Sequence, residues 1–583
     1  MASLRFGLST TESDGGLHLA LSVRNVDSRR PSAYAAAVPA PSFDLAARQR
    51  SLELAAQDVV DVVIVGGGIT GAGVAREAAL RGLRTVLVDK GDFASGTSSR
   101  SSKLIHGGLR YLAQGDLALV REAARERAVL RRLAPHLAQP LWMMVPTASL
   151  AGRVKMQAGV WAFEKLAGDE AGDKYQVLDR ADTLAQEPGL RPSPLAGAVV
   201  FQEYLTDDAR LVLENIQSAA GLGAMVANYA EVVGVEADPE GLRVSLRDHV
   251  GGAALVVRTR TLVNASGPWF ERIQGMAAQS SGQQDGARLQ LTRGIHLVVP
   301  HARLPVTHSV VLKSPDGRST FVVPRGRCVY IGTTDTHYEG RPEEPGVSAE
   351  DARYLLDSVA GTFADAPTAD DIVGTWSGVR PLLRQEGKSP SEISRRDEIL
   401  TGPGPVVAIA GGKLTTYRRM AERVCTQVFR LLGQGEPAGV DSAQIALAGG
   451  GLKEQATARA SVCPLADREL DARLWATYGA SAAGLVDDIH ANPALADRMG
   501  GLQDLTRAEV EHAVHHEMAT SVDDVLRRRS RVAMFDTQAA INAAPDTAQL
   551  LGGLLGWDSF RIAEEVESTT TTWSRELALV RSA

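Results

Sequence analysis

The sequence is poor in cysteine and contains no long apolar run. Its three cysteines, Cys328, Cys425 and Cys463, lie too far apart in the chain for a disulfide framework or a zinc-ligand spacing. No uncharged apolar stretch reaches the roughly 18 residues that a membrane-spanning helix needs. The N-terminal residues MASLRFGLSTTESDGG also lack the apolar core of a secretory signal. We therefore expect a cytoplasmic protein, either free or attached peripherally to the cytoplasmic face of a membrane.

The sequence is also short of lysine, and its charge is not basic overall. Only nine of its 62 basic residues are lysines, and the net charge at pH 7 is −7. This balance gives no support to a nucleic-acid partner. Hydrophobic residues make up 44% of the 583 residues, which is enough for several large cores. The composition therefore indicates a globular protein of more than one domain.

Three regions of the chain differ in pattern. Residues 1–57 are irregular and mix Ser, Pro and Ala, which predicts a flexible N-terminal extension ending in a short helix over residues 43–57. Residues 58–435 alternate strand-like apolar runs, glycine turns and helical segments. Beyond a glycine-rich connector, residues 436–583 have a helical period and predict a separate C-terminal helical domain.

The mixed pattern of the middle region predicts an α/β plus α+β fold. We expect a Rossmann-like, dinucleotide-binding domain interleaved with an antiparallel-sheet substrate domain. The substrate-binding part is expected mainly over about residues 115–200 and 285–385.

The strongest local signal is DVVIVGGGITGAGVAREAALRGLRTVLVDK, residues 61–90. A buried strand runs into the pattern Gly66-x-Gly68-x-x-Gly71, which is followed by a helix and by a second strand ending at Asp89. The first glycine permits the tight turn, the second lets backbone amides approach a pyrophosphate, and the third allows the helix to pack closely. The carboxylate of Asp89 is spaced to accept hydrogen bonds from ribose hydroxyls. Together these features predict a dinucleotide site.

Two later segments favour FAD over NAD as the cofactor. LVNASGPW, residues 262–269, is an apolar strand that ends in a turn of small residues. VVAIAGGKLTTYRRMAERV, residues 406–424, is a strand, a glycine pair and a helix start. The amides and the cation that it presents would stabilise the negative charge that a reduced flavin develops near N1.

Seven motifs, in this order along the chain, resemble the FAD-dependent glycerol-3-phosphate dehydrogenases, a family within the D-amino-acid-oxidase-like flavoprotein superfamily. The resemblance covers about residues 60–560. Its motifs are GGGITGAGVA (66–75), TSSRSSKLIHGGLRYL (97–112), DDARLVLEN (207–215), VNASGPW (263–269), IGTTDT (331–336), SGVRPLL (377–383) and GGKLTTYR (411–418).

The resemblance implies the oxidation of sn-glycerol 3-phosphate to dihydroxyacetone phosphate. A hydride would pass from C2 to flavin N5, and the electrons would then pass to a quinone in the membrane. Two alternatives stay open: an oxidase that delivers the electrons to oxygen and produces hydrogen peroxide, and a non-catalytic flavin-binding sensor. The partners implied are the substrate, a quinone, a membrane surface and a second copy of the chain as a homodimer.

The resemblance also implies the site residues by position. The serine hydroxyls and Lys103 would face the cofactor, and Gly107 and Gly108 would let the backbone pass close to the flavin. The expected cofactor-binding residues are Gly66, Gly68, Ile69, Thr70, Gly71, Asp89, Lys90, Thr97, Ser98, Ser99, Ser101, Ser102, Lys103, His106, Gly107, Gly108, Ser266, Gly267, Thr334, Gly412, Lys413, Leu414 and Thr415. The expected substrate-binding residues are Arg110, Tyr111, Arg380, Arg395 and Lys413.

Four of these residues are the expected catalytic residues: His106, His296, Arg380 and Lys413. Arginine stays protonated and binds phosphate through two parallel hydrogen bonds, so Arg380 is assigned to anchoring and charge stabilisation. Removal of a hydride from an alcohol also needs a base for the hydroxyl proton. The sequence does not choose among His106, His296 and Lys413 for that step.

Three other features have more than one reading. Arg527 to Arg531 (RRRSR) fits either a solvated helix end or a surface that faces anionic lipid. Residues 152–168 combine basic and apolar side chains over a broad arc, so a core helix and a membrane-surface helix are equally plausible. His512, His515 and His516 share one helical face, but no carboxylate or cysteine completes a metal site, and we predict none there.

Overall fold

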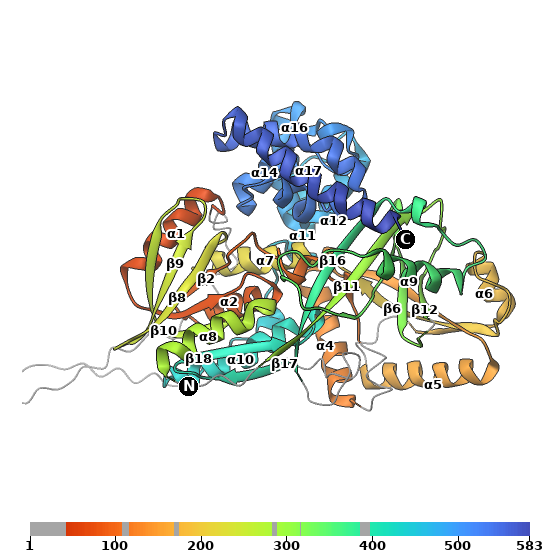
Figure 1. Cartoon of the computed structure of the whole chain (residues 1–583), viewed down its shortest axis with the longest axis horizontal. Coiled ribbons are helices and arrows are strands. Elements are labelled where there is room, and N and C mark those ends of the chain that lie inside the picture. The colour runs from red at the N-terminus through yellow and green to blue at the C-terminus, as the bar shows by residue number, and fades with distance from the viewer. Residues whose placement is uncertain (1–41, 108–115, 168–173, 283–287, 315, 385–396) are drawn as a thin grey trace, which may run out of the picture. The chain divides into compact units, whose positions relative to one another are not determined.

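Two β-sheets and a group of C-terminal helices form the described part of the chain (Figure 1). The structure is a computed structural model that describes residues 42–583 except 108–115, 168–173, 283–287, 315 and 385–396. The mixed α/β architecture, with an antiparallel second sheet and a helical C-terminal region, confirms the predicted fold class.

The first sheet is parallel at its centre and contains eight strands within the described residues. From edge to edge it runs β17 (Asp397–Thr401), β18 (Val406–Gly411), β10 (Ala254–Asn264), β1 (Val60–Val65), β2 (Thr85–Val88) and β7 (Met225–Ala227), with the hairpin β8 (Ala230–Asp238) and β9 (Gly241–Asp248) paired to β10. The strands β18, β10 and β1 are mutually parallel neighbours, so their carboxyl ends lie at the same edge. That edge is where open α/β sheets bind ligands.

Both faces of the first sheet are covered, which explains the apolar run Val62–Val65 in β1. Val62 and Ile64 point into one core, and Val63 and Val65 point into another. A strand that is buried on both faces cannot alternate apolar and polar residues. The first core is shared with α2 (Ile69–Leu80), α7 (Asp208–Gly221) and α10 (Tyr417–Leu431), and the second with α1 (Leu45–Gln57) and α8 (Phe270–Ser281).

The second sheet is mostly antiparallel and contains ten strands within the described residues. They are β15 (Thr336–His337), β11 (Leu289–Pro300), β14 (Cys328–Gly332), β13 (Ser319–Arg325), β12 (Ser309–Lys313), β4 (Gln139–Thr147), β6 (Gly197–Leu205) and β3 (Leu104–Ile105) in order, with β16 (Gly374–Leu383) paired to β11 and β5 (Gln176–Leu178) to β6. The associated helices are α4 (Leu117–Leu133), α5 (Leu150–Ala167), α6 (Arg180–Gln186) and α9 (Ala349–Ala360).

The helix expected over residues 43–57 is present as α1, but it is not part of a flexible extension. Arg48 is 1% exposed, and its guanidinium pairs with Asp248 at 2.6 Å while its Nε donates to the carbonyl of Asn228. Asp248 is 200 residues away in the chain, so no local pattern could reveal this buried ion pair. The prediction of flexibility is therefore wrong for residues 45–57, and the other predicted domain boundaries stay predictions.

The C-terminal helices pack on the second sheet and on a helix that covers the first, since α15 and α17 contact β16 and the turn at Asp524–Arg529 contacts α7. In Figure 1 they are the blue helices at the top. They are α11 (Leu452–Ser461), α12 (Arg468–Tyr478), α13 (Ala482–Ala491), α14 (Arg507–Glu517), a π-helical turn (Asp524–Arg529), α15 (Val532–Phe535), α16 (Thr537–Leu555) and α17 (Ser559–Arg581). Both readings of the basic run Arg527–Arg531 are wrong, because Arg527, Arg528 and Arg529 are buried in ion pairs inside the molecule.

Helix α5 has two different apolar faces, which resolves the broad arc seen in the sequence. Val160 and Phe163 are buried against the rest of the protein. Leu150, Val154 and Trp161 are 64%, 63% and 53% exposed, and at 3.6 residues per turn they fall within about 40° of one another. Among the described residues, no helix combines the length and the apolar character needed to cross a bilayer.

Candidate functional site

The glycine turn after β1 brings the backbone of α2 against the end of the parallel strands. Gly66 has a φ of 111°, and a Cβ at this position would lie 2.6 Å from the carbonyl oxygen of Ala265 at the end of β10. A side chain at Gly71 would collide with the carbonyl of Gly66. Only glycine therefore allows the strand, the turn and the helix to meet this closely.

A cavity lies at the carboxyl ends of β1, β10 and β18, where the three turns after these strands face one another. Most of the predicted cofactor-binding residues line it: Gly66, Gly68, Ile69, Thr70, Asp89, Lys90, Thr97, Ser98, Ser101, Ser266, Gly267, Gly412, Lys413 and Leu414. The structure thus brings together segments that are up to about 350 residues apart in the sequence, as a cofactor with two distant ends requires.

Asp89 directly follows β2, and its carboxylate is hydrogen-bonded to the glycine turn. Its Oδ2 accepts a hydrogen bond from the backbone N–H of Gly67 at 2.6 Å, and its Oδ1 accepts one from Gly91 at 2.8 Å. Burial raises the pKa of Asp89 to about 6, although these two N–H donors act in the opposite direction. A carboxylate has more than two lone pairs, so Asp89 can still accept from a ribose hydroxyl that enters the cavity.

The opposite end of the cavity is built by the glycine pair after β18. Gly411 and Gly412 have φ values of 72° and 83°, and a side chain at Gly412 would collide with the end of Met420 on α10. The chain then enters a helical turn at Leu414, which presents a helix start to the cavity. Glycine turns that no side chain could occupy, a carboxylate at one end and a helix start at the other are what the phosphates, the ribose and the ring of FAD require, so these residues fit FAD.

Lys90 and Trp269 line one side of the cavity, and both contact Glu343, which comes from the region of the second sheet. The Lys90 ammonium lies 4.0 Å from the centre of the Trp269 ring and 2.5 Å from a carboxylate oxygen of Glu343. The indole N–H of Trp269 donates to the same oxygen at 2.6 Å. Glu343 comes from the segment between β15 and α9, and no local pattern around it predicts that it reaches this cavity.

The segment from Thr97 to Lys103 passes between the two sheets. The Thr97 hydroxyl donates to the carbonyl of Val379 at 2.6 Å, and the Trp376 indole donates to the carbonyl of Ser101 at 3.1 Å. Ser98, at the start of this segment, accepts a hydrogen bond from the backbone N–H of Ile69 at 2.9 Å. Strand β16 of the second sheet and the start of α2 therefore hold the serine-rich stretch in place.

Lys103 does not face the cavity, which corrects the prediction for its ammonium. It is 0% exposed and pairs with Asp208 at 2.7 Å, and it also donates to the carbonyl of Ser99 at 2.8 Å. Burial lowers the pKa of Lys103 to about 8, with Asp208 acting in the opposite direction. Because Asp208 also accepts bonds from the backbone N–H and hydroxyl of Ser101, this pair fixes the segment rather than the cofactor.

His296 lies on β11 beside the same segment. Its Nε2 is 2.9 Å from the hydroxyl of Ser102, and its ring stacks on Trp376 with centroids 4.5 Å apart. Burial, with a smaller contribution from the positive charges of Arg380 and Lys103, holds the pKa of His296 well below its ordinary value. The imidazole is therefore neutral at pH 7.

Arg380 lies on β16, directly before Pro381, which lines the cavity. Its guanidinium donates to Asp335 and to the hydroxyl of Thr333, both at 3.0 Å, and to the carbonyl of Thr334 at 3.1 Å. The hydroxyl of Thr334 accepts from a backbone N–H of β11, so Thr334 supports this corner with its own polar atoms. These bonds hold the guanidinium in one orientation.

The turn at His106 and Gly107 is held by residues that the sequence did not single out. The backbone N–H of Gly107 donates to both carboxylate oxygens of Glu203 at 3.1 Å, and Glu203 pairs with Arg127 at 2.7 Å. A side chain at Gly107 would collide with the ring of Phe163. Phe163 therefore leaves no room for a side chain at position 107. The expectation that the backbone passes close to the flavin at this glycine stays a prediction.

The structure separates the expected catalytic residues into two groups. His296 and Arg380 form one group on the second sheet, where they interact electrostatically. His106 and Lys413 form the other, since the carbonyl of His106 accepts a 3.4 Å hydrogen bond from Thr415, two residues after Lys413. Ser99, Ser102 and Gly71 do not line the cavity. Gly108, Arg110, Tyr111 and Arg395 lie outside the described residues.

Two of the three C-terminal histidines, His512 and His516, take part in local contacts, and His515 is exposed. The Nε2 of His512 lies 3.4 Å from Glu517, and its ring packs edge-on to Tyr478 at 5.1 Å and beside His516 at 4.8 Å. Packing within the C-terminal helices therefore explains why His512 and His516 share one helical face.

Comparison with protein families gives two consecutive matches. Residues 61–418 match the family described as FAD dependent oxidoreductase. Residues 440–562 match the family described as C-terminal domain of alpha-glycerophosphate oxidase. The first match covers the cavity and both sheets, and the second covers most of the C-terminal helices.

The chain is also similar to whole proteins. It is 39% identical over 399 residues to the aerobic glycerol-3-phosphate dehydrogenase of Bacillus subtilis, which corresponds to 68% of this chain and 71% of the relative. It is 39% identical over 381 residues to the enzyme of the same name from Staphylococcus aureus, covering 64% of this chain and 68% of the relative. A solved structure of the glycerol-3-phosphate dehydrogenase from Bacillus halodurans complexed with FAD superimposes with a TM-score of 0.75 at 29% identity, covering 92% of this chain and 98% of that one.

Proposed function

The chain belongs to the FAD-dependent glycerol-3-phosphate dehydrogenases, and from this membership we infer that it oxidises sn-glycerol 3-phosphate to dihydroxyacetone phosphate. The observation that carries the proposal is Arg380, an oriented guanidinium on the strand that leads into the flavin cavity. A phosphate monoester is the natural partner of such a group. The 20% exposure of its side chain leaves room for a ligand to reach it.

FAD supplies a ring that accepts a hydride from the substrate carbon. The turn at Gly66 and Gly68, the carboxylate of Asp89, Ser98 and the helix start at Leu414 would hold it in the cavity. Lys413 lines the same end of the cavity and brings a positive charge to the side where the substrate would meet the cofactor.

We assign the uptake of the hydroxyl proton to His296. Because burial keeps its imidazole neutral at pH 7, a ring nitrogen is available to accept a proton, and Ser102 fixes the orientation of Nε2. Arg380 lies close enough to influence the charge of this ring, so the proton acceptor and the phosphate anchor share one corner of the second sheet. His106 and Lys413 are the other candidates for the same step.

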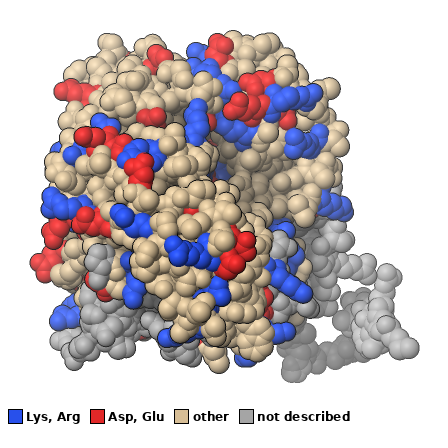
Figure 2. All heavy atoms as spheres, turned by 90° about the vertical axis from the view of Figure 1, so that its right-hand side faces the viewer, with Lys and Arg blue, Asp and Glu red and all other residues tan. Residues whose placement is uncertain are grey.

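A membrane quinone is the proposed electron acceptor, with the protein attached to the cytoplasmic face of the membrane. The exposed Leu150, Val154 and Trp161 of α5 form an apolar stripe that a bilayer surface can cover. Basic and acidic side chains are interspersed on the face shown in Figure 2, which carries no single basic patch. The oxidase alternative requires oxygen as the acceptor instead.

Anaerobic titration of the FAD-loaded protein with glycerol 3-phosphate tests the substrate. Flavin absorbance should fall as the cofactor is reduced, and an oxidised flavin after excess substrate would disprove the proposal and favour the sensor alternative. Arg380→Ala should raise the KM for glycerol 3-phosphate by about 100-fold or more, because a partly buried charge-assisted bond to phosphate is lost. Arg384→Ala, which removes an exposed arginine next in the chain after β16, is the matched control.

Turnover with a soluble quinone analogue, compared with turnover in oxygenated buffer, separates the two acceptors. Faster turnover with oxygen and release of hydrogen peroxide would establish the oxidase instead. Flotation with lipid vesicles tests attachment, since Trp161→Ser should weaken it while Trp557→Ser, in the turn between α16 and α17, should not.

A further inference from the structure

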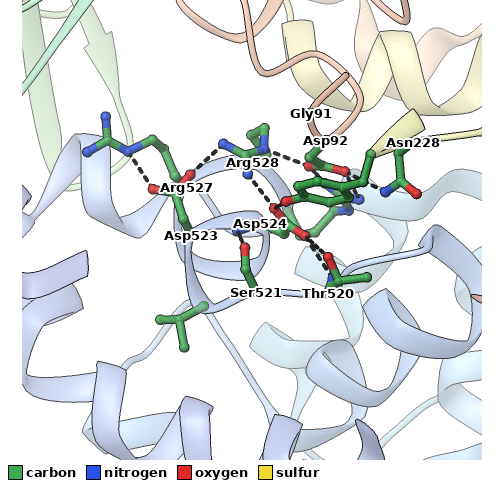
Figure 3. Close-up of polar contacts among 12 residues, drawn as sticks. Gly91, Asp92, Asn228, Thr520, Ser521, Asp523, Asp524, Arg527 and Arg528 are labelled. Atoms are coloured by element: carbon green, nitrogen blue, oxygen red, sulfur yellow. Dashed lines mark hydrogen bonds and ion pairs between the residues drawn. The ribbon is translucent and has the colours of Figure 1, made fainter. Parts of the chain in front are cut away.

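The basic run at the end of the π-helical turn is joined to the cofactor-binding loop by buried ion pairs (Figure 3). Arg529 donates to both oxygens of Asp92, at 2.6 and 3.0 Å. Arg528 donates to the same carboxylate at 2.6 Å. Asp92, Arg528 and Arg529 are 1%, 4% and 2% exposed, so these charges meet in the interior of the molecule.

Asp92 lies in the loop that shapes one end of the cavity. The backbone N–H of Gly91 donates to Asp89, and the backbone N–H of Ala94 donates to the carbonyl of Gly67 at 3.0 Å. The loop is thus bonded on one side to the glycine turn and to the carboxylate that lines the cavity. On its other side it is held by the two arginines. Although burial alone would raise it, Arg529 and Arg528 hold the pKa of Asp92 below its ordinary value.

A second connection runs beside the first. Asn228 donates to Asp92 at 3.2 Å and to the carbonyl of Met518 at 2.9 Å. The hydroxyl of Tyr229 donates to Asp524 at 2.6 Å, and its backbone N–H donates to the carbonyl of Gly91 at 2.9 Å. The next residue in the chain lines the cavity, so this strand end is tied both to the cofactor loop and to the C-terminal helices.

A third connection reaches the serine-rich segment. Arg531 forms an ion pair with Asp207, whose side chain also accepts from a backbone N–H in the first turn of α7. The next residue, Asp208, holds Ser101 and Lys103. Three separate contacts of one short C-terminal segment therefore lead to residues that line or support the FAD cavity.

We propose that the C-terminal helices are a positioning element of the FAD site, and that the Asp92–Arg528–Arg529 ion pairs control how tightly FAD is retained. Removing the Asp92 charge leaves Arg528 paired with Asp523 and Asp524, and Arg529 with Glu517, all within the C-terminal region. The two buried arginines then have no ion pair to the loop, which favours separation of the loop from the helices. The loop then no longer holds the Gly91 N–H against Asp89. The coupling must be reciprocal, so bound FAD also stabilises the docking of the C-terminal helices. The inference depends only on FAD binding and not on the proposed substrate.

The release of FAD from the holoenzyme, followed by the recovery of flavin fluorescence, tests the proposal without any substrate. In Asp92→Asn, FAD should dissociate about tenfold faster than in the wild type, at a temperature where circular dichroism shows a folded protein. Arg529→Lys keeps the charge but loses the two parallel bonds, and it should show a smaller increase in the same direction. It is the variant to use if D92N does not fold.

Arg473→Lys is the matched control, because Arg473 makes the same kind of paired bonds to Glu509, both at 2.6 Å, entirely within the C-terminal helices. It should lower the unfolding temperature without changing FAD release. Hydrogen exchange gives the reciprocal measurement: removing FAD from the wild type should speed exchange over residues 524–535, and in D92N this dependence on FAD should disappear. Equal FAD release in wild type, D92N and R529K, or faster release in R473K as well, would overturn the proposal.

Discussion

Gly294 on β11 provides the space into which the Arg380 guanidinium folds. A Cβ at position 294 would lie 2.8 Å from Cζ of Arg380 and 2.5 Å from the hydroxyl oxygen of Thr333. Non-bonded heavy atoms need about 3.5 Å, so the guanidinium in a Gly294→Ala variant must move by about 1 Å. The backbone at position 294 has the extended conformation of a strand, which any residue can adopt. The part of Arg380 that would contact the new methyl group is the end of a flexible side chain. We therefore expect the variant to fold and to bind FAD.

The expected loss is in catalysis. A displacement of about 1 Å of a group that positions the substrate costs about 100-fold in rate, which corresponds to about 2.7 kcal/mol of transition-state stabilisation. Steady-state kinetics with glycerol 3-phosphate and a quinone analogue should show this as a fall in kcat/KM, with most of the change in KM because Arg380 is assigned to the phosphate. Flavin absorbance measures the bound FAD in the same samples.

Gly234→Ala is the control for a new methyl group in a strand. Its Cβ would lie 3.5 Å from the side chain of Ser245, an ordinary contact, so kcat/KM should stay at the wild-type value. If G294A has wild-type kcat/KM with its FAD in place, the assignment of Arg380 to the substrate is refuted. If G294A loses FAD, the methyl group acts on the fold and the geometric argument fails.

Two further predictions concern the cofactor. Because burial raises the pKa of Asp89 to about 6, lowering the pH from about 7 to about 5 protonates this carboxylate and removes acceptor sites. The Kd for FAD, measured by fluorescence titration, should rise with a limiting slope of about tenfold per pH unit below pH 6, and Asp89→Asn should remove this dependence. Glu343→Gln should speed FAD release about two- to fivefold, because the exposed pair with Lys90 is weakened while the indole of Trp269 keeps an acceptor. Glu344→Gln changes the exposed side chain next in the chain, and its rate of FAD release should match the wild type. Equal release rates for the two variants would contradict a role of Glu343 in closing the cavity.

The parts of the fold that sequence alone could predict are those set by short-range pattern. The glycine turn between β1 and α2 and the glycine pair after β18 both have an apolar strand before them and a helix after them, and both line the cavity. The two-sided burial of β1 follows from its run of valine and isoleucine over residues 62–65. In each case the residues that determine the structure lie within about 15 positions of one another.

Ion pairs between distant residues could not be predicted in this way. Lys103 looks like a cofactor ligand in its local stretch, but its partner Asp208 is 105 positions away. Arg529 looks like part of a surface run, but Asp92 is 437 positions away. A charged residue has the same local pattern whether it meets solvent, lipid or a buried carboxylate, and the tertiary fold alone decides among them.

The ties between Asp92 and the C-terminal arginines also set a sequence of events during protein synthesis. A ribosome that adds roughly 5 to 20 residues per second takes about 20 to 90 s to travel from Asp92 to Arg529. During that interval the glycine turn has left the ribosome, while first β18 and then the arginines that hold the cofactor loop are still to be made. We therefore expect stable insertion of the flavin to be a late step in the maturation of the nascent chain, and chains interrupted before Arg528 to be released without it.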